Sequence, residues 1–96
     1  MSAICDAIQG LNLIELHYDG YGRVVEPHAY GSTSKGHDVL RAYQISGGSQ
    51  SGQSRGWKLL RLDEAYSVNA LGDTFQGSRN GYRRNDSAMS TIYCQL

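Results

Sequence analysis

Residues 13–26, with the sequence LIELHYDGYGRVVE, carry the pattern that decides the fold. From Ile14 to Tyr18, apolar residues alternate with polar ones, which is the period of a half-buried β-strand. The DGYG sequence that follows tolerates positive φ angles, so Arg23–Glu26 is predicted to return as the second strand of a hairpin. Pro27 lacks a backbone N–H, and we expect it to end the regular ladder of that strand.

The period-two pattern recurs further along the chain. The next predicted strands are Val39–Ile45, Trp57–Leu62 and Ala65–Leu71, and Ser90–Leu96 is a candidate last strand. In the first of these segments, one face carries Val39, Arg41, Tyr43 and Ile45, and the other carries Leu40, Ala42 and Gln44. Five short strands joined by tight turns predict a mainly β fold, a small barrel that closes its own edges.

A short helix is predicted ahead of these strands. Between Ala3 and Leu11 the apolar residues recur at helical spacing, with Ser2 as a suitable N-cap and Gly10 as a suitable end. So short a helix is not stable alone, and we expect it to dock on the strands.

The connecting segments are polar. Gly31–Gly36 is predicted to be a loop, and Ser46–Gly56, which is rich in glycine and serine, is predicted to be a mobile one. Residues 72–96 form a C-terminal extension that the sequence leaves largely open, although Phe75 is expected to pack on the barrel and residues 77–85 resemble a loop.

Length and charge bound the function. The 96 residues suit a single domain, and nine basic against nine acidic residues exclude a polybasic DNA-coating protein. No apolar run approaches the roughly 20 residues that cross a bilayer, and the N-terminus carries no basic leader, so we expect a cytoplasmic protein without membrane contact. In that compartment Cys5 and Cys94 are expected to be reduced thiols.

No catalytic or metal-binding constellation is visible. The three histidines, His17, His28 and His37, lie in different segments without the spacing of metal ligands, and no glycine-rich phosphate loop or nucleophile motif is present. We therefore predict a protein that is not an enzyme and has no catalytic residue, metal or cofactor.

Basic residues concentrate in one part of the chain. Residues 41–61 carry no acidic residue and four basic ones, Arg41, Arg55, Lys58 and Arg61, and a second basic cluster, Arg79, Arg83 and Arg84, surrounds Tyr82. Arginines beside aromatic rings, such as Arg41 with Tyr43 and Arg61 with Trp57, suit a ligand that carries phosphates and bases. The alternative is that these are solvated strand residues beside a core tryptophan, and that Arg61 pairs with Asp63 or Glu64.

Three stretches in this order resemble the WYL domain of bacterial regulators: Arg23–Pro27, Val39–Tyr43 and Trp57–Asp63. The resemblance begins at the helix near Ile4 and covers about residues 4–68. The name-giving Trp-Tyr-Leu triplet corresponds to residues 38–40, DVL, so only its leucine is retained.

This resemblance implies an SH3-like or Sm-like five-stranded barrel that senses a ligand in transcription regulation or bacterial defence. It implies a nucleotide or single-stranded nucleic acid as the ligand. Arg41 and Arg61, then Lys58, occupy matching positions, with Tyr43 and Trp57 as neighbouring rings.

Two hypotheses from different classes follow. The first is a non-enzymatic regulatory module that binds a nucleotide-like anion or a short single strand. The second is a module that binds a regulatory protein or a second copy of itself through the barrel edge or the loop near Tyr30. Phosphate binding weakens with salt, whereas an apolar interface does not.

Overall fold

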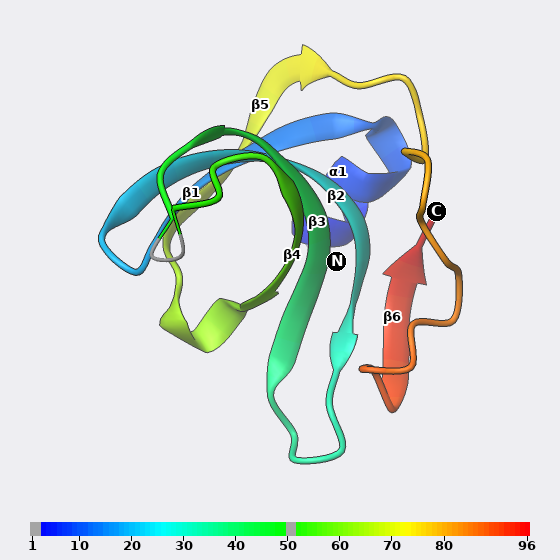
Figure 1. The fold of residues 1–96 in the computed structure, drawn as a ribbon. Helices are drawn as coiled ribbons and strands as arrows, with labels where there is room; N and C mark the ends of the chain where they lie inside the picture. Colours follow the sequence, from blue (N-terminus) through cyan, green and yellow to red (C-terminus); the bar gives the residue numbers. More distant parts are fainter. Residues whose placement is uncertain (1–2, 50–51) are drawn as a thin grey trace.

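The computed structural model describes residues 3–49 and 52–96. Six antiparallel strands form one sheet beside a short helix, which confirms the predicted mainly β class (Figure 1). In chain order the elements are α1 (Ala3–Gly10), β1 (Asn12–Tyr18), β2 (Tyr21–Ser32), β3 (Asp38–Gly47), β4 (Gly56–Arg61), the 3-10 helix η1 (Leu62–Glu64), β5 (Tyr66–Thr74) and β6 (Thr91–Gln95).

The sheet is curved but not closed. Its strand order is β4-β3-β2-β1-β5, and β6 pairs with β2 beside that path. β4 and β5 are the two ends of this order and do not pair with each other, so the structure does not confirm the predicted closed barrel. The 3-10 helix η1 replaces the predicted end of the fourth strand at Leu62 and leads from β4 to β5.

The second strand is longer than its sequence predicts. It runs to Ser32, so the expectation that Pro27 ends its regular ladder is only partly met: the register with β3 shifts between Pro27 and Ala29, and pairing then continues. This end of β2 is paired on both sides, because β3 continues along Ala29–Ser32 and β6, from the far end of the chain, pairs with the same residues. The expected loop from Gly31 therefore begins two residues later, after Ser32.

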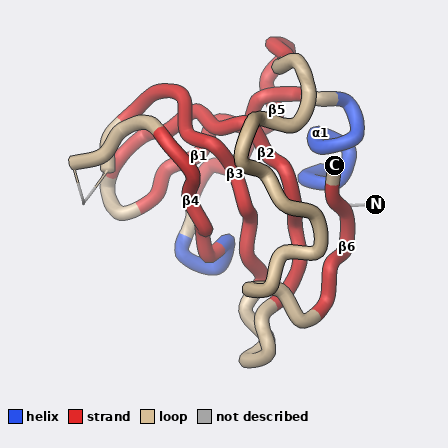
Figure 2. Tube along the Cα trace, turned by 45° about the vertical axis from the view of Figure 1, so that its right-hand side comes forward, coloured by secondary structure: helices blue, strands red, loops and turns tan. Residues whose placement is uncertain are grey.

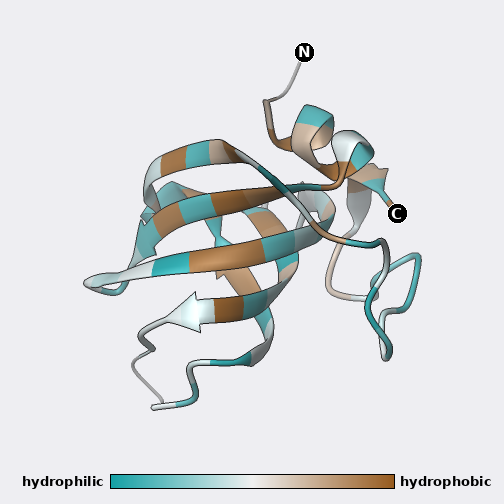
Figure 3. Cartoon of the chain, turned by 90° about the horizontal axis from the view of Figure 1, so that it is seen from above, coloured by the Kyte–Doolittle hydropathy of each residue, from teal (hydrophilic) through white to brown (hydrophobic). Residues whose placement is uncertain are grey.

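Hydrophobic and hydrophilic residues alternate along parts of the strands (Figure 3), and successive side chains of a strand point to opposite faces of the sheet. Leu40, Ala42 and Gln44 of β3 have no exposed surface, which confirms that these three share the inner face. The main core consists of aliphatic residues from α1 and four strands: Ala7, Ile8, Ile14, Leu16, Val25, Leu40, Ala42 and Leu60. The helix thus docks on the strands as expected, through Ala7 and Ile8.

The two cysteines form a disulfide, so the prediction of reduced thiols is wrong. The bond joins Cys5 of α1 to Cys94 of β6, residues that are 89 positions apart in the sequence. Spacing alone could not show this proximity, because it arises only when β6 pairs with β2 and returns beside the helix.

The segment between β5 and β6, residues 75–90, is called the strap below. It crosses the outer face of β2 and β3 (Figure 2). Phe75 at its start is 8% exposed, so its expected packing is confirmed. Met89 near its end packs with Ala29 and Val39 in a second, smaller core.

The structure does not describe every residue for which the sequence makes a prediction. Ser2, the predicted helix cap, and residues 50 and 51 of the predicted mobile loop lie outside the described residues. No helix of the described chain is long and apolar enough to span a bilayer.

Candidate functional site

A layer of rings lies between the sheet and the strap. Strand pairing places Tyr43 opposite Trp57, and their ring centroids are 5.5 Å apart in an edge-to-face arrangement. His28 of β2 lies 4.8 Å from the ring of Trp57, and the strap adds Tyr82 at 5.0 Å from His28. Such contacts stabilise a defined geometry beyond simple burial, and here they join the sheet to the strap.

His28 is the anchor of this layer. It has no exposed surface, its Nδ1–H donates to the Glu26 carbonyl at 2.8 Å, and its Nε2 accepts the Arg79 backbone N–H at 2.9 Å. Both ring nitrogens are therefore occupied and the ring is neutral, and burial lowers its pKa below the ordinary value. His28 positions the strap and is not available as a metal ligand or a base.

Two ion pairs hold the strap to the sheet. Arg79 donates from Nε and Nη2 to both carboxylate oxygens of Glu26, at 2.8 and 2.9 Å, and its guanidinium lies 4.0 Å from the Tyr43 ring centroid. Arg41 donates in the same two-pronged way to Asp86, at 2.6 and 3.3 Å. The hydrogen bonds from Arg41 lower the pKa of the Asp86 carboxyl below its ordinary range.

A groove of about 470 Å³ opens where the strap passes Trp57, and we call it the strap groove. Its lining residues come from β3, β4 and the strap: Arg41, Trp57, Gly81, Tyr82, Arg83, Arg84, Asn85, Asp86 and Ser87. Gly81 has φ +95° and lies so close to Trp57 that a Cβ would be 3.2 Å from the indole Nε1. Only glycine allows the strap to turn there against the ring.

The last residues of the chain support the wall of the groove. Arg84 Nε donates to the Leu96 backbone oxygen at 2.9 Å, and the Tyr82 hydroxyl donates to the same oxygen at 3.3 Å. The Gln95 side chain accepts the Asn85 backbone N–H at 2.8 Å. Because these residues follow Cys94 directly, the disulfide and β6 stabilise the groove.

The five predicted ligand-binding residues do not lie in one place. Arg41 and Trp57 line the strap groove, and Tyr43 packs behind Trp57 under Arg79. Lys58 donates to the Gln53 carbonyl at 2.7 Å and to the Ser49 hydroxyl at 3.4 Å, in the connection before β4. Arg61 lies apart from these residues, at the end of β4.

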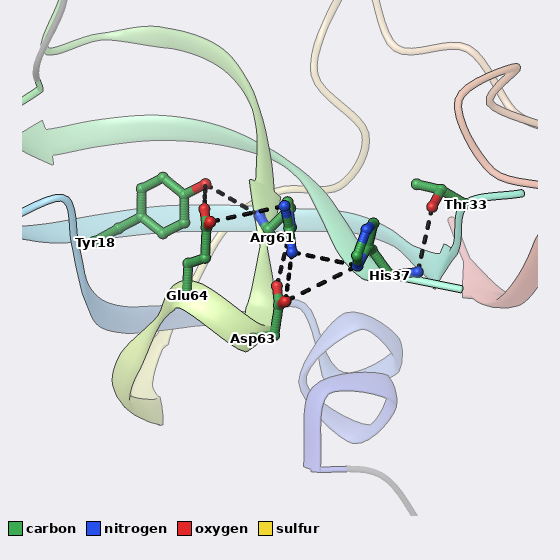
Figure 4. A network of polar contacts seen from close by, with 6 residues as sticks. All are labelled: Tyr18, Thr33, His37, Arg61, Asp63 and Glu64. Atoms are coloured by element: carbon green, nitrogen blue, oxygen red, sulfur yellow. Dashed lines mark hydrogen bonds and ion pairs between the residues drawn. The ribbon is translucent and has the colours of Figure 1, made fainter. Parts of the chain in front are cut away.

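Arg61 belongs to a separate network at the start of η1 (Figure 4). Its guanidinium donates to both carboxylate oxygens of Asp63, at 3.1 and 2.6 Å, and to His37 Nδ1 at 3.2 Å. Glu64 lies 3.7 Å away, and Asp63 is half exposed. This is the arrangement of the alternative reading, in which Arg61 pairs with its own neighbours.

The sequence prediction did not assign four residues of the groove a role. Tyr82, Arg83 and Arg84 were visible only as a basic cluster around a tyrosine, and Asp86 was given no role in binding. Their placement depends on the route of the strap across the sheet.

Within the described part of the chain, no three His, Cys, Asp or Glu residues lie close enough to hold a metal ion. No family model matches the sequence, and no curated protein or solved structure matches it.

Proposed function

We propose that the protein is a non-enzymatic module that binds a nucleotide-like anion in the strap groove. The observation that carries this proposal is an excess of guanidinium groups beside half-buried aromatic rings. The lining includes Arg41, Arg83 and Arg84 against a single carboxylate, Asp86. The volume of about 470 Å³ lies within the range of small-molecule sites.

The exposed arginines supply the anion-binding part of this chemistry. Arg83 and Arg84 are exposed on the strap, and a guanidinium binds phosphate through two parallel hydrogen bonds. The rings of Trp57 and Tyr82 lie beside them, and rings of this kind stack on nucleobases. The groove therefore offers both halves of a nucleotide a partner.

Two other grooves lack this combination. One is lined by Glu26 and Arg79, which neutralise each other, and by Phe75. The other is lined by His37, Asp38 and Asp63 and is acidic. The size of the strap groove favours a single nucleotide over a longer strand, and binding of an oligonucleotide is an outcome that the test distinguishes.

Trp57 makes the proposal directly testable, because it is the only tryptophan in the chain and lines the groove. We expect adenosine 5′-monophosphate to change the Trp57 fluorescence with saturation, and to bind more weakly as salt rises. Arg83→Gln should weaken this binding about tenfold, since a hydrogen bond to a charged group contributes about 1.5–3 kcal/mol.

Lys35→Gln is the matched control, because Lys35 is an exposed cation in the turn between β2 and β3, away from the groove. It should bind as the wild type does. A five-residue oligonucleotide that binds more than tenfold tighter than the monophosphate would assign the groove to single strands instead. No saturable signal, or equal losses in both variants, would contradict the proposal.

We also propose that the curved sheet is an SH3-like barrel with an open seam between β4 and β5. Support comes from Tyr18, whose hydroxyl accepts the Arg61 backbone N–H at 3.3 Å and donates to Glu64 at 3.2 Å (Figure 4). This side chain spans the seam where strand pairing is missing. In line with the resemblance to WYL domains, the bound ligand would control a transcription regulator or a defence system.

The second candidate is an interaction module that acts through the sheet edge. β5 pairs only with β1 among the described strands, and its Tyr66 is 73% exposed and its Val68 36% exposed. An exposed edge with apolar residues favours pairing with another chain. Sedimentation over a range of concentrations should then show a dimer that Tyr66→Lys dissociates, whereas a monomer at all concentrations would exclude self-association.

A further inference from the structure

The anion-binding fork of one groove arginine is already occupied. Asp86 accepts from Arg41 Nε at 2.6 Å and from Nη2 at 3.3 Å, and its side chain is only 10% exposed. A carboxylate in this position holds the guanidinium as a phosphate group would. Arg41 itself is 28% exposed, and both members of the pair line the strap groove, so the occupied fork lies at the proposed ligand site.

We propose that Asp86 is an intramolecular competitor for the phosphate of the ligand, and that it determines which ligands enter the strap groove. Binding exchanges the Asp86 carboxylate for the phosphate on the fork of Arg41. This inference rests on the proposed nucleotide-binding function and names the residue that sets its specificity.

The exchange has a physical basis in charge. Two anions cannot share one guanidinium fork without repulsion, so the carboxylate and the phosphate exclude each other. A phosphate monoester carries up to two negative charges and three acceptor oxygens, which favours it over a carboxylate for the same fork. An uncharged nucleoside or a simple carboxylate lacks this advantage and leaves the Arg41–Asp86 pair intact.

The strap supplies a second hydrogen-bond donor for the displaced Asp86 carboxylate. Asp86 Oδ1 also accepts the Ala88 backbone N–H at 3.0 Å, a hydrogen bond that does not depend on Arg41. The other ion pair, between Arg79 and Glu26, anchors the strap beyond Gly81 and takes no part in the exchange. The strap therefore stays attached while its Asp86 side chain moves away from the fork.

Removal of the competitor should raise affinity. When only a fraction of a protein is in its binding-competent state, the apparent affinity is reduced by that fraction. Asp86→Asn removes the competing ion pair, so it should bind adenosine 5′-monophosphate about tenfold tighter than the wild type. Adenosine without phosphate should bind both proteins equally. Asp19→Asn makes the same change of charge in the exposed turn between β1 and β2 and should stay within about twofold of the wild type.

Equal or weaker monophosphate binding by a folded Asp86→Asn would overturn the inference, because Asp86 would then only position Arg41. Equal tightening by Asp19→Asn would also overturn it, since the effect would be general charge. If neither protein shows saturable binding, the proposed function itself fails and the exchange with it.

A second measurement covers the case in which Asp86→Asn does not fold. In the wild type, the carboxyl carbon resonance of Asp86 can be titrated with and without adenosine 5′-monophosphate. Displacement from Arg41 must raise the pKa of Asp86 from its lowered position. An unchanged Asp86 titration at saturating ligand would contradict the exchange.

Discussion

Arg41 and Arg61 form the same kind of ion pair in two regions of the molecule. Arg41 holds Asp86 across 45 residues of sequence, and the two side chains are 28% and 10% exposed. Arg61 holds Asp63 two residues away, and there the exposed fractions are 39% and 50%. The shortest N–O distance is 2.6 Å in both pairs, so bond geometry does not separate them.

The difference lies in what each pair connects. The Arg61 pair joins neighbours in the chain and is solvated, and pairs of this kind contribute little to stability. The Arg41 pair joins the strap to the sheet and leaves a nearly buried carboxylate without a cationic partner if it breaks. Of the two ion pairs, only the one in the strap region therefore depends on a long-range contact, and four predictions test that contrast.

The largest effect is expected from the disulfide that supports the strap region. Replacing Cys5 and Cys94 together by serine should lower the free energy of unfolding by about 4 kcal/mol, because the bond closes a loop of 89 residues in the unfolded chain. Urea unfolding measures this loss. A thiol reductant should shift the wild type by a similar amount and leave the double variant unchanged. Equal midpoints for the wild type with and without reductant would contradict the prediction.

Next in size is the loss of the Arg41 pair. Arg41→Ala should lower the free energy of unfolding by about 2 kcal/mol, since Asp86 would remain nearly buried without its partner. Arg41→Ala combined with Asp86→Ala should recover part of that loss in urea unfolding. If Asp86→Ala lowers the free energy of unfolding as much in the Arg41→Ala background as it does alone, the two residues are not coupled.

The pH dependence of stability should report His28. Burial lowers its pKa in the folded protein, so the unfolded chain binds a proton more readily. Stability from the neutral ring is fully present above about pH 6.5 and is lost as the pH falls from there toward the lowered folded value. Melting temperatures between pH 7 and pH 5 should therefore fall for the wild type.

His17 serves as the control for this titration, because it is exposed on β1. His17→Gln should keep the fall in melting temperature, and His28→Gln, although less stable at pH 7, should lose most of it. If His17→Gln loses the fall in melting temperature and His28→Gln keeps it, the pH dependence of stability does not come from His28.

The smallest effect is expected at the η1 network. Arg61→Ala should leave the urea midpoint and the binding of adenosine 5′-monophosphate close to those of the wild type, because its partners are exposed and it lies outside the strap groove. Loss of binding in this variant, with unchanged folding, would support the ligand-binding role that the resemblance to WYL domains implies for Arg61. The two arginines would then not differ in the way proposed here.

Much of the strand layout could be predicted, because alternation is a local property. The hairpin around Asp19 and Gly20 and the two faces of β3 follow directly from neighbouring residues. The length of β2 could not be predicted, because a register shift at Pro27 lets the pairing with β3 continue and because β6, more than 60 residues further along the chain, pairs with the same end of β2.

Only part of the candidate site could be predicted from the sequence. Arg41 and Trp57 could be proposed because they lie on the outer faces of two neighbouring strands. Arg83 and Arg84 could be noticed as a cluster but not placed, since the strap has no regular secondary structure and its route follows contacts with β2 and β3.

By itself, the sequence determined the mainly β class and the side of each strand that faces the core, because successive side chains of a strand point to opposite faces. Only the tertiary structure decided that Arg41 meets Asp86, that Cys5 meets Cys94 and that Arg61 stays with Asp63. The first two contacts join residues 45 and 89 positions apart, and such contacts exist only once strand order and the path of the strap bring them together.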